Sequence, residues 1–236
     1  MTTKIAAKKP AAGQINPPES LTESSLVIRK TSRKRTFLIG LSLLIAIGFT
    51  WWKTYAEDRF VPKRFGVVVP GTIYRSGQIS KWQIENVLLK YNIKGIIDFQ
   101  GFDWNEEHQQ AELAVAWKYK IAVNRFPQSG DGTGNIVHYA EAIRIMSEYE
   151  AAGKPLLVHC AAGSQRTGAV VAFYRLLVQK KSPQEALKEM ARYDCEPAEN
   201  MKLIHYMNNN MEKLAQLLVE RNVIETVPDP IPQLQP

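Results

Sequence analysis

The stretch that most constrains the fold is PLLVHCAAGSQRTGAVVAFYRLL, Pro155 to Leu177. An apolar run ends in a loop of small residues, and a second apolar run with helical spacing begins near Arg166. A continuous apolar strand is typical of a sheet covered by helices on both faces. The stretch therefore predicts a buried strand, a tight loop and the N-terminus of a helix.

The rest of the domain alternates β-branched runs with amphipathic stretches. This alternation predicts an α/β fold with a mainly parallel central sheet flanked by helices. A strand, turn and strand are predicted within 58–78, and Ser80 is predicted to cap the next helix. The predicted strands further along are 96–99, 121–128 and 155–160, and the predicted helices are 80–92, 106–120, 136–153, 165–180, 182–194 and 198–222.

The positive charge of the chain lies mostly in its first residues. Residues 1–35 carry eight Lys and Arg against two Glu, and so account for +6 of the net +7. A nucleic-acid-binding domain needs a basic patch on the fold itself, and we therefore expect no nucleic-acid partner. Because residues 1–35 are also poor in large apolar side chains, we predict a disordered basic tail.

An uncharged apolar run, Phe37–Trp52, follows this tail. We predict that residues 36–55 form a single transmembrane anchor ahead of a catalytic domain at 56–222. A cleaved secretory signal and a buried core helix are the alternatives. The charge asymmetry predicts a cytoplasmic N-terminus and a catalytic domain outside the membrane or in the periplasm. The Pro-rich segment 223–236 is predicted to be a flexible tail.

The chain has two cysteines, Cys160 and Cys195. This number provides no disulfide framework, and the histidines lack zinc-ligand spacing with the cysteines. We expect no metal and no cofactor. Cys195 is expected to be structural, with a redox role beside Cys160 as the alternative.

The loop after the apolar strand has the composition of an anion site. Its small side chains let backbone N–H groups close around a ligand of phosphate size, and the helix N-terminus adds positive potential. The planar guanidinium of Arg166 can hold two phosphate oxygens. The residues predicted to bind phosphate are Ala161, Ala162, Gly163, Ser164, Gln165 and Arg166.

A cysteine in such a loop acquires a lowered pKa and becomes a nucleophilic thiolate. Cys160 is therefore the predicted nucleophile, with Thr167 donating its hydroxyl to the sulfur and His159 ordering the loop. A buried cysteine in an ordinary strand-to-helix turn is the structural alternative.

The run HCAAGSQRTG resembles the His-Cys-x5-Arg-Thr/Ser-Gly signature of the cysteine-based protein tyrosine phosphatase superfamily. The length of the domain and the run GTIYRSGQ, Gly71 to Gln78, are similar to its compact dual-specificity group. The resemblance covers most of residues 66–180. It implies a dual-specificity phosphatase-like fold and hydrolysis of phosphomonoesters through a cysteinyl-phosphate.

This resemblance also implies an aspartate on a mobile loop before the cysteine, which protonates the leaving oxygen. Asp131 lies 29 residues before Cys160 among three glycines and is the predicted general acid. A solvated turn is the alternative role for it, and Asp98 is predicted to order structure. Weaker acid candidates are Asp103, Glu106 and Glu107, and Arg75 is predicted to brace the loop or Asp98, or else to form a surface salt bridge.

The sequence therefore predicts a membrane-anchored phosphatase whose substrate is a phosphorylated protein or a small phosphoester. Two other functions remain open at this point. One is a phosphate-binding module without turnover, which would keep Arg166 and the loop but not an acid. The other is a sulfurtransferase similar to rhodaneses, against which the run Arg166-Thr167-Gly168 argues.

Overall fold

The structure is a computed structural model that describes residues 33–52 and 61–235. The chain divides into two units near residue 47, the first of which contains most of helix α1, Arg33–Trp51. The second unit holds the α/β domain. Residues 1–32, most of the predicted disordered tail, lie outside the described part.

The apolar side chains of α1 are exposed, Phe37 and Leu44 among them. Even so, within residues 33–52 and 61–235 no helix combines the length and apolar character that crossing a membrane requires. The transmembrane anchor predicted at 36–55 is therefore not supported, and its end at 53–55 lies outside the described residues.

Five strands form the sheet of the domain, in the order β1-β2-β5-β3-β4. Strand β1 pairs with β2 in antiparallel orientation, and the other three pairings are parallel, which confirms the mainly parallel sheet. The central position of β5 follows from its sequence, since all four of its side chains are buried. The strands are Gly66–Val69, Ile73–Ser76, Gly95–Asp98, Ala122–Arg125 and Leu156–His159, numbered β1 to β5.

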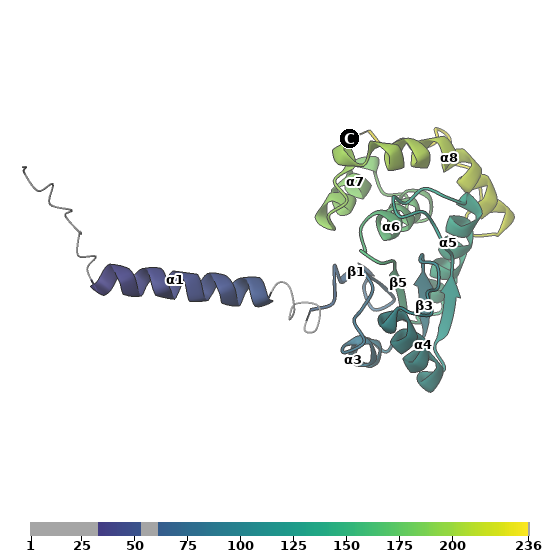
Figure 1. The fold of residues 1–236 in the computed structure, drawn as a ribbon. Coiled ribbons are helices and arrows are strands. Elements are labelled where there is room, and N and C mark those ends of the chain that lie inside the picture. Colours follow the sequence, from purple (N-terminus) through teal and green to yellow (C-terminus); the bar gives the residue numbers. More distant parts are fainter. Residues whose placement is uncertain (1–32, 53–60, 236) are drawn as a thin grey trace, which may run out of the picture. The chain divides into compact units, whose positions relative to one another are not determined.

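Helices cover both faces of this sheet (Figure 1). Leu156 and Val158 of β5 join a large core with α5, α6, α7 and α8, whereas Leu157 joins a smaller core with α3 and α4. The helices are α3 Ile84–Lys90, α4 Glu107–Tyr119, α5 Ile136–Ala151, α6 Gln165–Leu177, α7 Pro183–Arg192 and α8 Met201–Glu220, with a 3-10 turn at Pro197–Glu199.

Two predicted features of the chain differ in the structure. Helix α3 begins at Ile84 with Gln83 as its N-cap, so Ser80 does not cap it. The predicted flexible tail instead packs on the domain, where Leu234 is 1% exposed and exchanges hydrogen bonds of 2.8 and 2.9 Å with Asn208. Apolar residues spaced along residues 223–234 give this tail enough surface to bury, which its proline content does not reveal.

Candidate active site

The loop between β5 and α6 is held from outside by its carbonyl groups. The carbonyls of Ala161, Ala162 and Gly163 each accept a hydrogen bond from an earlier part of the chain, and so the N–H on the other side of each of these peptide planes is turned toward the inside of the loop. Gly163 N–H accordingly donates to the Cys160 sulfur at 3.2 Å. The outer bonds are Gln78 N–H to Ala161 (3.0 Å), Arg64 Nη1 to Ala162 (2.8 Å) and Arg75 Nη2 to Gly163 (2.8 Å).

The loop packs backbone against backbone on the end of β2. Gly163 has φ +76°, and a Cβ there would lie 2.4 Å from the nitrogen of Gly77. A Cβ on Gly77 would in turn meet the carbonyl oxygen of Ala162 at 2.8 Å. Only glycine fits at these two positions, so both residues fix the shape of the loop.

Cys160 is 1% exposed at the start of this loop. Burial alone would raise the pKa of its thiol, but the Thr167 hydroxyl, the Arg166 charge and the backbone N–H groups of Thr167 and Gly163 outweigh burial and lower the pKa. The Thr167 hydroxyl is buried and completes no other hydrogen bond among the described residues, which leaves its proton available to the sulfur. The lowered pKa favours the thiolate that a nucleophile requires.

Arg166 lies in the first turn of α6 and is partly buried. Its Nη1 donates to the carbonyl of Phe99 at 3.2 Å, while its buried Nε has no partner among the described residues. The guanidinium is thus fixed at one end only, and donors remain for an anion in the loop.

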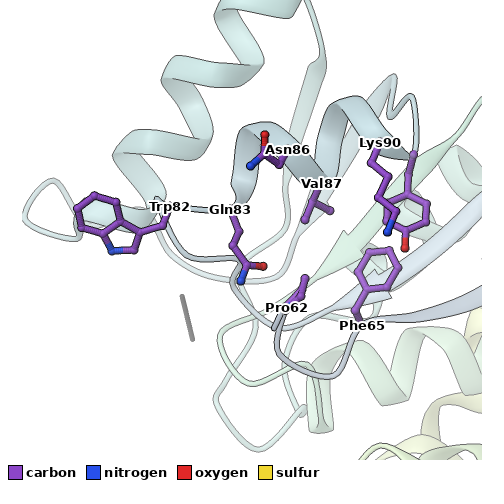
Figure 2. Close-up of a pocket in the computed structure, with 8 residues that line it drawn as sticks. Pro62, Phe65, Trp82, Gln83, Asn86, Val87 and Lys90 are labelled. Atoms are coloured by element: carbon purple, nitrogen blue, oxygen red, sulfur yellow. The ribbon is translucent and has the colours of Figure 1, made fainter. Parts of the chain in front are cut away.

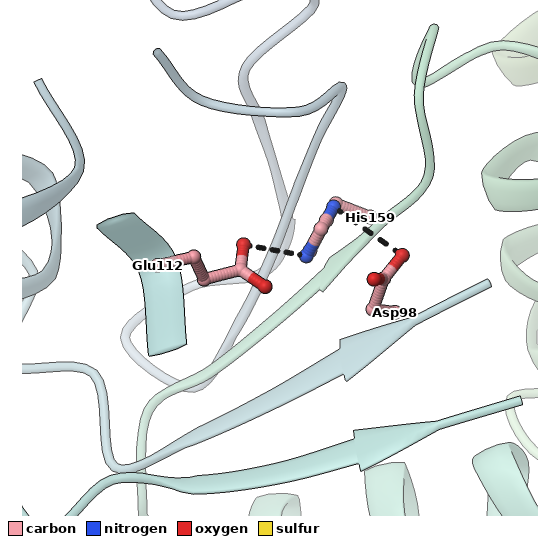
Figure 3. A group of neighbouring side chains, drawn as sticks. All are labelled: Asp98, Glu112 and His159. Atoms are coloured by element: carbon pink, nitrogen blue, oxygen red, sulfur yellow. Dashed lines mark ion pairs between the residues drawn. The ribbon is translucent and has the colours of Figure 1, made fainter. Parts of the chain in front are cut away.

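A cluster of charged side chains contains His159, the residue before Cys160 (Figure 3). His159 is fully buried, with its Nε2 3.0 Å from Glu112 Oε2 and its Nδ1 3.8 Å from Asp98 Oδ1. Burial lowers the pKa of His159, but the two carboxylates dominate and raise it to about 9. Burial raises the pKa of Glu112, yet His159 and Arg125 outweigh it and leave the pKa lowered. The raised pKa favours the imidazolium form of His159, next to Cys160.

Asp98, Glu112 and His159 offer ligand atoms within 4.8 Å of one another, a spacing that could hold a metal ion. Arg125, however, bonds Asp98 through Nη1 and lies 3.7 Å from Glu112 through Nη2. A metal ion would have to displace this guanidinium. Burial raises the pKa of Asp98 despite the neighbouring His159. We interpret the group as a charge-paired cluster that positions His159, the ordering role expected of Asp98.

The structure brings Asp131 to the same end of the sheet. Its loop touches the start of α6, since a Cβ on Gly132 would lie 3.3 Å from the backbone of Gln165. The Asp131 carboxylate bonds Lys202 Nζ at 2.6 Å and accepts from Thr133 N–H at 3.0 Å. These bonds lower the pKa of Asp131 to about 2, with Lys202 as the largest cause. Asp131 is therefore ionised in this arrangement.

The remaining predicted residues divide between the site and its supports. Ser164 turns its hydroxyl to the carbonyl of Asp194 at 2.8 Å, and Gln165 reaches Asn200 at 3.4 Å. Arg75 is buried and braces the loop, as one of its predicted roles required. Cys195 is buried against Gly168, a structural position.

The other acid candidates have local partners. Asp103 accepts from Asn105 N–H at 2.9 Å, and Glu106 accepts from Gln109 N–H at 2.6 Å as the N-cap of α4. Glu107 forms an ion pair with Lys81.

Sequence reasoning missed Glu112, Arg125 and Arg64. The signal for Glu112 was a charged residue on the face of α4 that packs on the sheet, one turn before Ala116. Arg125 ends a strand, as Asp98 and His159 do, and parallel register brings the three side by side, with Asp98 paired to both others.

Not every cavity belongs to this site. A cavity of about 590 Å³ lies between the segment at Pro62 and Phe65 and helix α3, with Trp82 at its edge (Figure 2). Its lining contains no residue of the phosphate loop.

A lowered-pKa cysteine in a loop of inward N–H groups, beside an arginine and after a central parallel strand, defines a cysteine-based phosphatase of the dual-specificity type. The family model of DSP-PTPase phosphatases fused to NAD+ kinase matches residues 69–209, more than half of the chain. The chain belongs to this phosphatase family, and such phosphatases are phosphoric monoester hydrolases.

Curated relatives agree with this assignment. The mouse phosphatidylglycerophosphatase and protein-tyrosine phosphatase 1 is 30% identical over 112 residues, 45% of this chain and 55% of the relative. The dual specificity protein phosphatase TpbA of Pseudomonas aeruginosa is 30% identical over 123 residues, 51% of this chain and 50% of the relative. The chain thus spans about half the length of these relatives.

Solved structures show the shared fold. The crystal structure of P. aeruginosa TpbA has a TM-score of 0.53 and 22% identity, covering 68% of this chain and 91% of that one. The core catalytic domain of the PP-IP phosphatase SIW14 from S. cerevisiae has a TM-score of 0.54 and 20% identity, covering 70% and 96%.

Proposed function

We propose that this chain hydrolyses phosphate monoesters through a cysteinyl-phosphate intermediate. The observation that supports the proposal most strongly is the loop itself, in which the N–H of Gly163 donates to the Cys160 sulfur at 3.2 Å and Arg166 lies alongside. Such a loop binds the equatorial oxygens of a phosphoryl group and stabilises the charge that develops on them.

In the first step the Cys160 thiolate attacks phosphorus in line, and the S–P bond forms while the P–O bond to the leaving group breaks. The leaving oxygen takes a proton from Asp131. In the second step Asp131 removes a proton from water, whose oxygen attacks phosphorus. The S–P bond then breaks, and inorganic phosphate and the thiolate are released.

The Asp131–Lys202 ion pair bears directly on this sequence of steps. The ionised carboxylate of the structure is the form needed for the second step. For the first step it must carry a proton, and so the bond to Lys202 must break. A bound phosphate dianion near Asp131 favours protonation of the carboxylate.

The test is hydrolysis of para-nitrophenyl phosphate by the full chain in EDTA. We expect vanadate-sensitive turnover that Cys160→Ser lowers by roughly 10⁴-fold or more, because the nucleophile is removed. Cys195→Ala is the matched control and should retain turnover. Turnover that survives Cys160→Ser would contradict the proposal.

A phosphate-binding module without turnover is the second candidate. The observation that favours it is the engagement of Asp131 with Lys202 and Thr133. In that case phosphate would bind through Arg166. Substitution of Cys160 or Asp131 would then leave phosphate-ester hydrolysis unchanged, because the wild-type protein would show none. Phosphate binding by a wild-type protein that turns over no ester would support this candidate.

We also propose that α1 holds the protein at a membrane. The proposal is supported by the exposed large apolar side chains of α1, between 44% and 70% exposed, and by the basic residues at its start. Pelleting with membranes, lost when residues 33–52 are deleted, would support it. A C-terminal reporter active only outside the cytoplasm would support the orientation predicted from charge, with the catalytic domain outside or in the periplasm.

The names of the relatives bear on the substrate class. The mouse relative is named a phosphatidylglycerophosphatase as well as a protein-tyrosine phosphatase, and the Pseudomonas relative a dual specificity protein phosphatase. A phosphorylated protein and a small phosphoester both fit the proposed chemistry.

A further inference from the structure

A second cavity, of about 250 Å³, adjoins the phosphate loop. Ala161 lines it and directly follows Cys160, and Gln100 lines it and directly follows Phe99, the acceptor of the Arg166 hydrogen bond. Consecutive Cα atoms are about 3.8 Å apart. A group esterified to a phosphate in the loop can therefore reach this cavity.

The lining of this cavity is polar. None of its eight residues is Phe, Tyr or Trp, and hydrogen-bond donors and acceptors are mixed. Lys63 and Glu106 carry opposite charges, so the lining has no excess of positive charge to attract a second phosphate. The eight residues are Val61, Lys63, Gln78, Ser80, Gln100, Glu106, His108 and Ala161.

Ser80 supplies an independent observation. The residue is 6% exposed, and its hydroxyl has no hydrogen-bond partner among the described residues. Because α3 begins only at Ile84, the hydroxyl does not serve as the predicted helix cap. A buried hydroxyl without a partner is unfavourable, and a ligand hydroxyl would relieve that cost.

The other polar groups are held in fixed orientations. Gln100 Nε2 donates to Gln78 Oε1 at 2.7 Å, and Gln78 Nε2 donates to Glu112 at 3.3 Å. His108 Nδ1 accepts from Lys81 N–H at 3.0 Å, so the neutral ring carries its proton on Nε2 as a donor. Preorganised neutral groups of this kind suit a ligand with several hydroxyls.

We propose that this cavity is a subsite for the leaving group and that the leaving group is a polyol, so that the substrate is the phosphate monoester of a polyhydroxylated alcohol. This inference rests on the proposed function and specifies its substrate class. The polyol can be a free molecule or the headgroup of a lipid, since both present the same hydroxyls. A phosphotyrosine ring would find no Phe, Tyr or Trp side chain and no extended apolar wall in this cavity.

The experiment compares kcat/KM of the full chain for five substrates. Glycerol 3-phosphate and inositol 1-phosphate represent free polyols, and vesicles containing a phosphatidylinositol monophosphate represent the headgroup. The other two substrates are a phosphotyrosine peptide and para-nitrophenyl phosphate. We expect kcat/KM for at least one polyol ester, free or in a lipid headgroup, to exceed kcat/KM for the phosphotyrosine peptide. Whether the free esters or the vesicles give the higher value identifies the polyol as a free molecule or a headgroup.

The variants Ser80→Ala and Gln100→Ala should lower the ratio of polyol-ester to para-nitrophenyl phosphate turnover by about three- to tenfold each, the value of one lost hydrogen bond. Ser147→Ala is the matched control, because Ser147 on α5 also has a buried hydroxyl without a partner among the described residues. It should leave the ratio unchanged.

Two results would overturn the inference. One is a wild-type preference for the peptide over every polyol ester. The other is an unchanged ratio in both Ser80→Ala and Gln100→Ala. Either result, with para-nitrophenyl phosphate still hydrolysed, leaves the proposed function standing, whereas absence of all turnover overturns both.

Discussion

Two charged regions flank the cysteine, and they are built differently. Behind it, His159, Asp98 and Glu112 are each 0% exposed. In the second region, the side chains of Asp131 and Lys202 are 39% and 77% exposed. Water screens the second pair but not the first group. The proposed nucleophile therefore lies beside buried charges, whereas the proposed proton donor lies in an exposed ion pair.

The largest effect is expected in the exposed region. Asp131→Asn removes the proposed proton donor and should lower kcat by about 10²- to 10⁴-fold for an alkyl phosphate. The loss should be smaller for para-nitrophenyl phosphate, whose leaving group needs less protonation. Steady-state kinetics with both substrates measures the difference.

The stability of Asp131→Asn should change little, because exposed ion pairs contribute little. A large drop in Tm, or equal losses with the two substrates, would show that Asp131 is structural.

The buried region should respond in the opposite way, mainly in stability. Glu112→Gln leaves His159 without its closest negative partner, and breaking a buried pair costs about 3 to 5 kcal/mol. His159 should then become neutral, and the pKa of Cys160 should rise. Urea unfolding and the pH dependence of iodoacetamide alkylation measure these two effects.

Glu148→Gln is the matched control, since Glu148 forms an exposed ion pair with Arg144. A loss of stability in Glu112→Gln no greater than in this control would mean that the buried cluster is not charge-paired.

The same pair predicts a pH dependence. The pKa of His159 is raised from 6.5 to about 9, so its contribution to stability is complete below pH 6.5 and is lost as the pH rises through 9. The difference in unfolding free energy between wild type and Glu112→Gln should therefore shrink between pH 6.5 and 9.5. A difference that stays constant over this range would contradict an imidazolium at His159.

The smallest effect concerns Lys202. Lys202→Ala removes the largest cause of the lowered pKa of Asp131. The pKa should rise, so that more Asp131 carries a proton at a given pH and kcat should increase below neutral pH. An exposed ion pair is worth at most about 1 kcal/mol, which limits the increase to about fivefold.

Lys213→Ala, an exposed lysine further along α8, is the control for Lys202→Ala. A decrease in kcat for Lys202→Ala alone would instead assign Lys202 to substrate binding.

How far the sequence predicted the site depends on distance along the chain. Cys160, Gly163, Arg166 and Thr167 lie within eight residues, and local geometry is enough to bring their groups together. Glu112 lies 47 residues before His159, and Lys202 lies 71 residues after Asp131. Nothing in the spacing of these residues indicated that they meet.

The errors have the same origin. Ser80 matched the sequence pattern of a helix cap, but α3 begins four residues later. Ser80 instead lines the cavity that Ala161 of the phosphate loop also lines. The composition of the tail after residue 222 is typical of a flexible segment. In the structure, however, Leu234 is buried against the domain. Composition describes one partner of a contact and not the other.

The sequence by itself determined the phosphate loop, because a strand, small residues and a helix start in succession must turn their amide groups toward one another. The tertiary structure alone decided which charges surround that loop. Parallel register lined up Asp98, His159 and Arg125 at one edge of the sheet, and helix packing added Glu112. These choices depend on contacts between distant segments, whose free energies no single stretch of sequence contains.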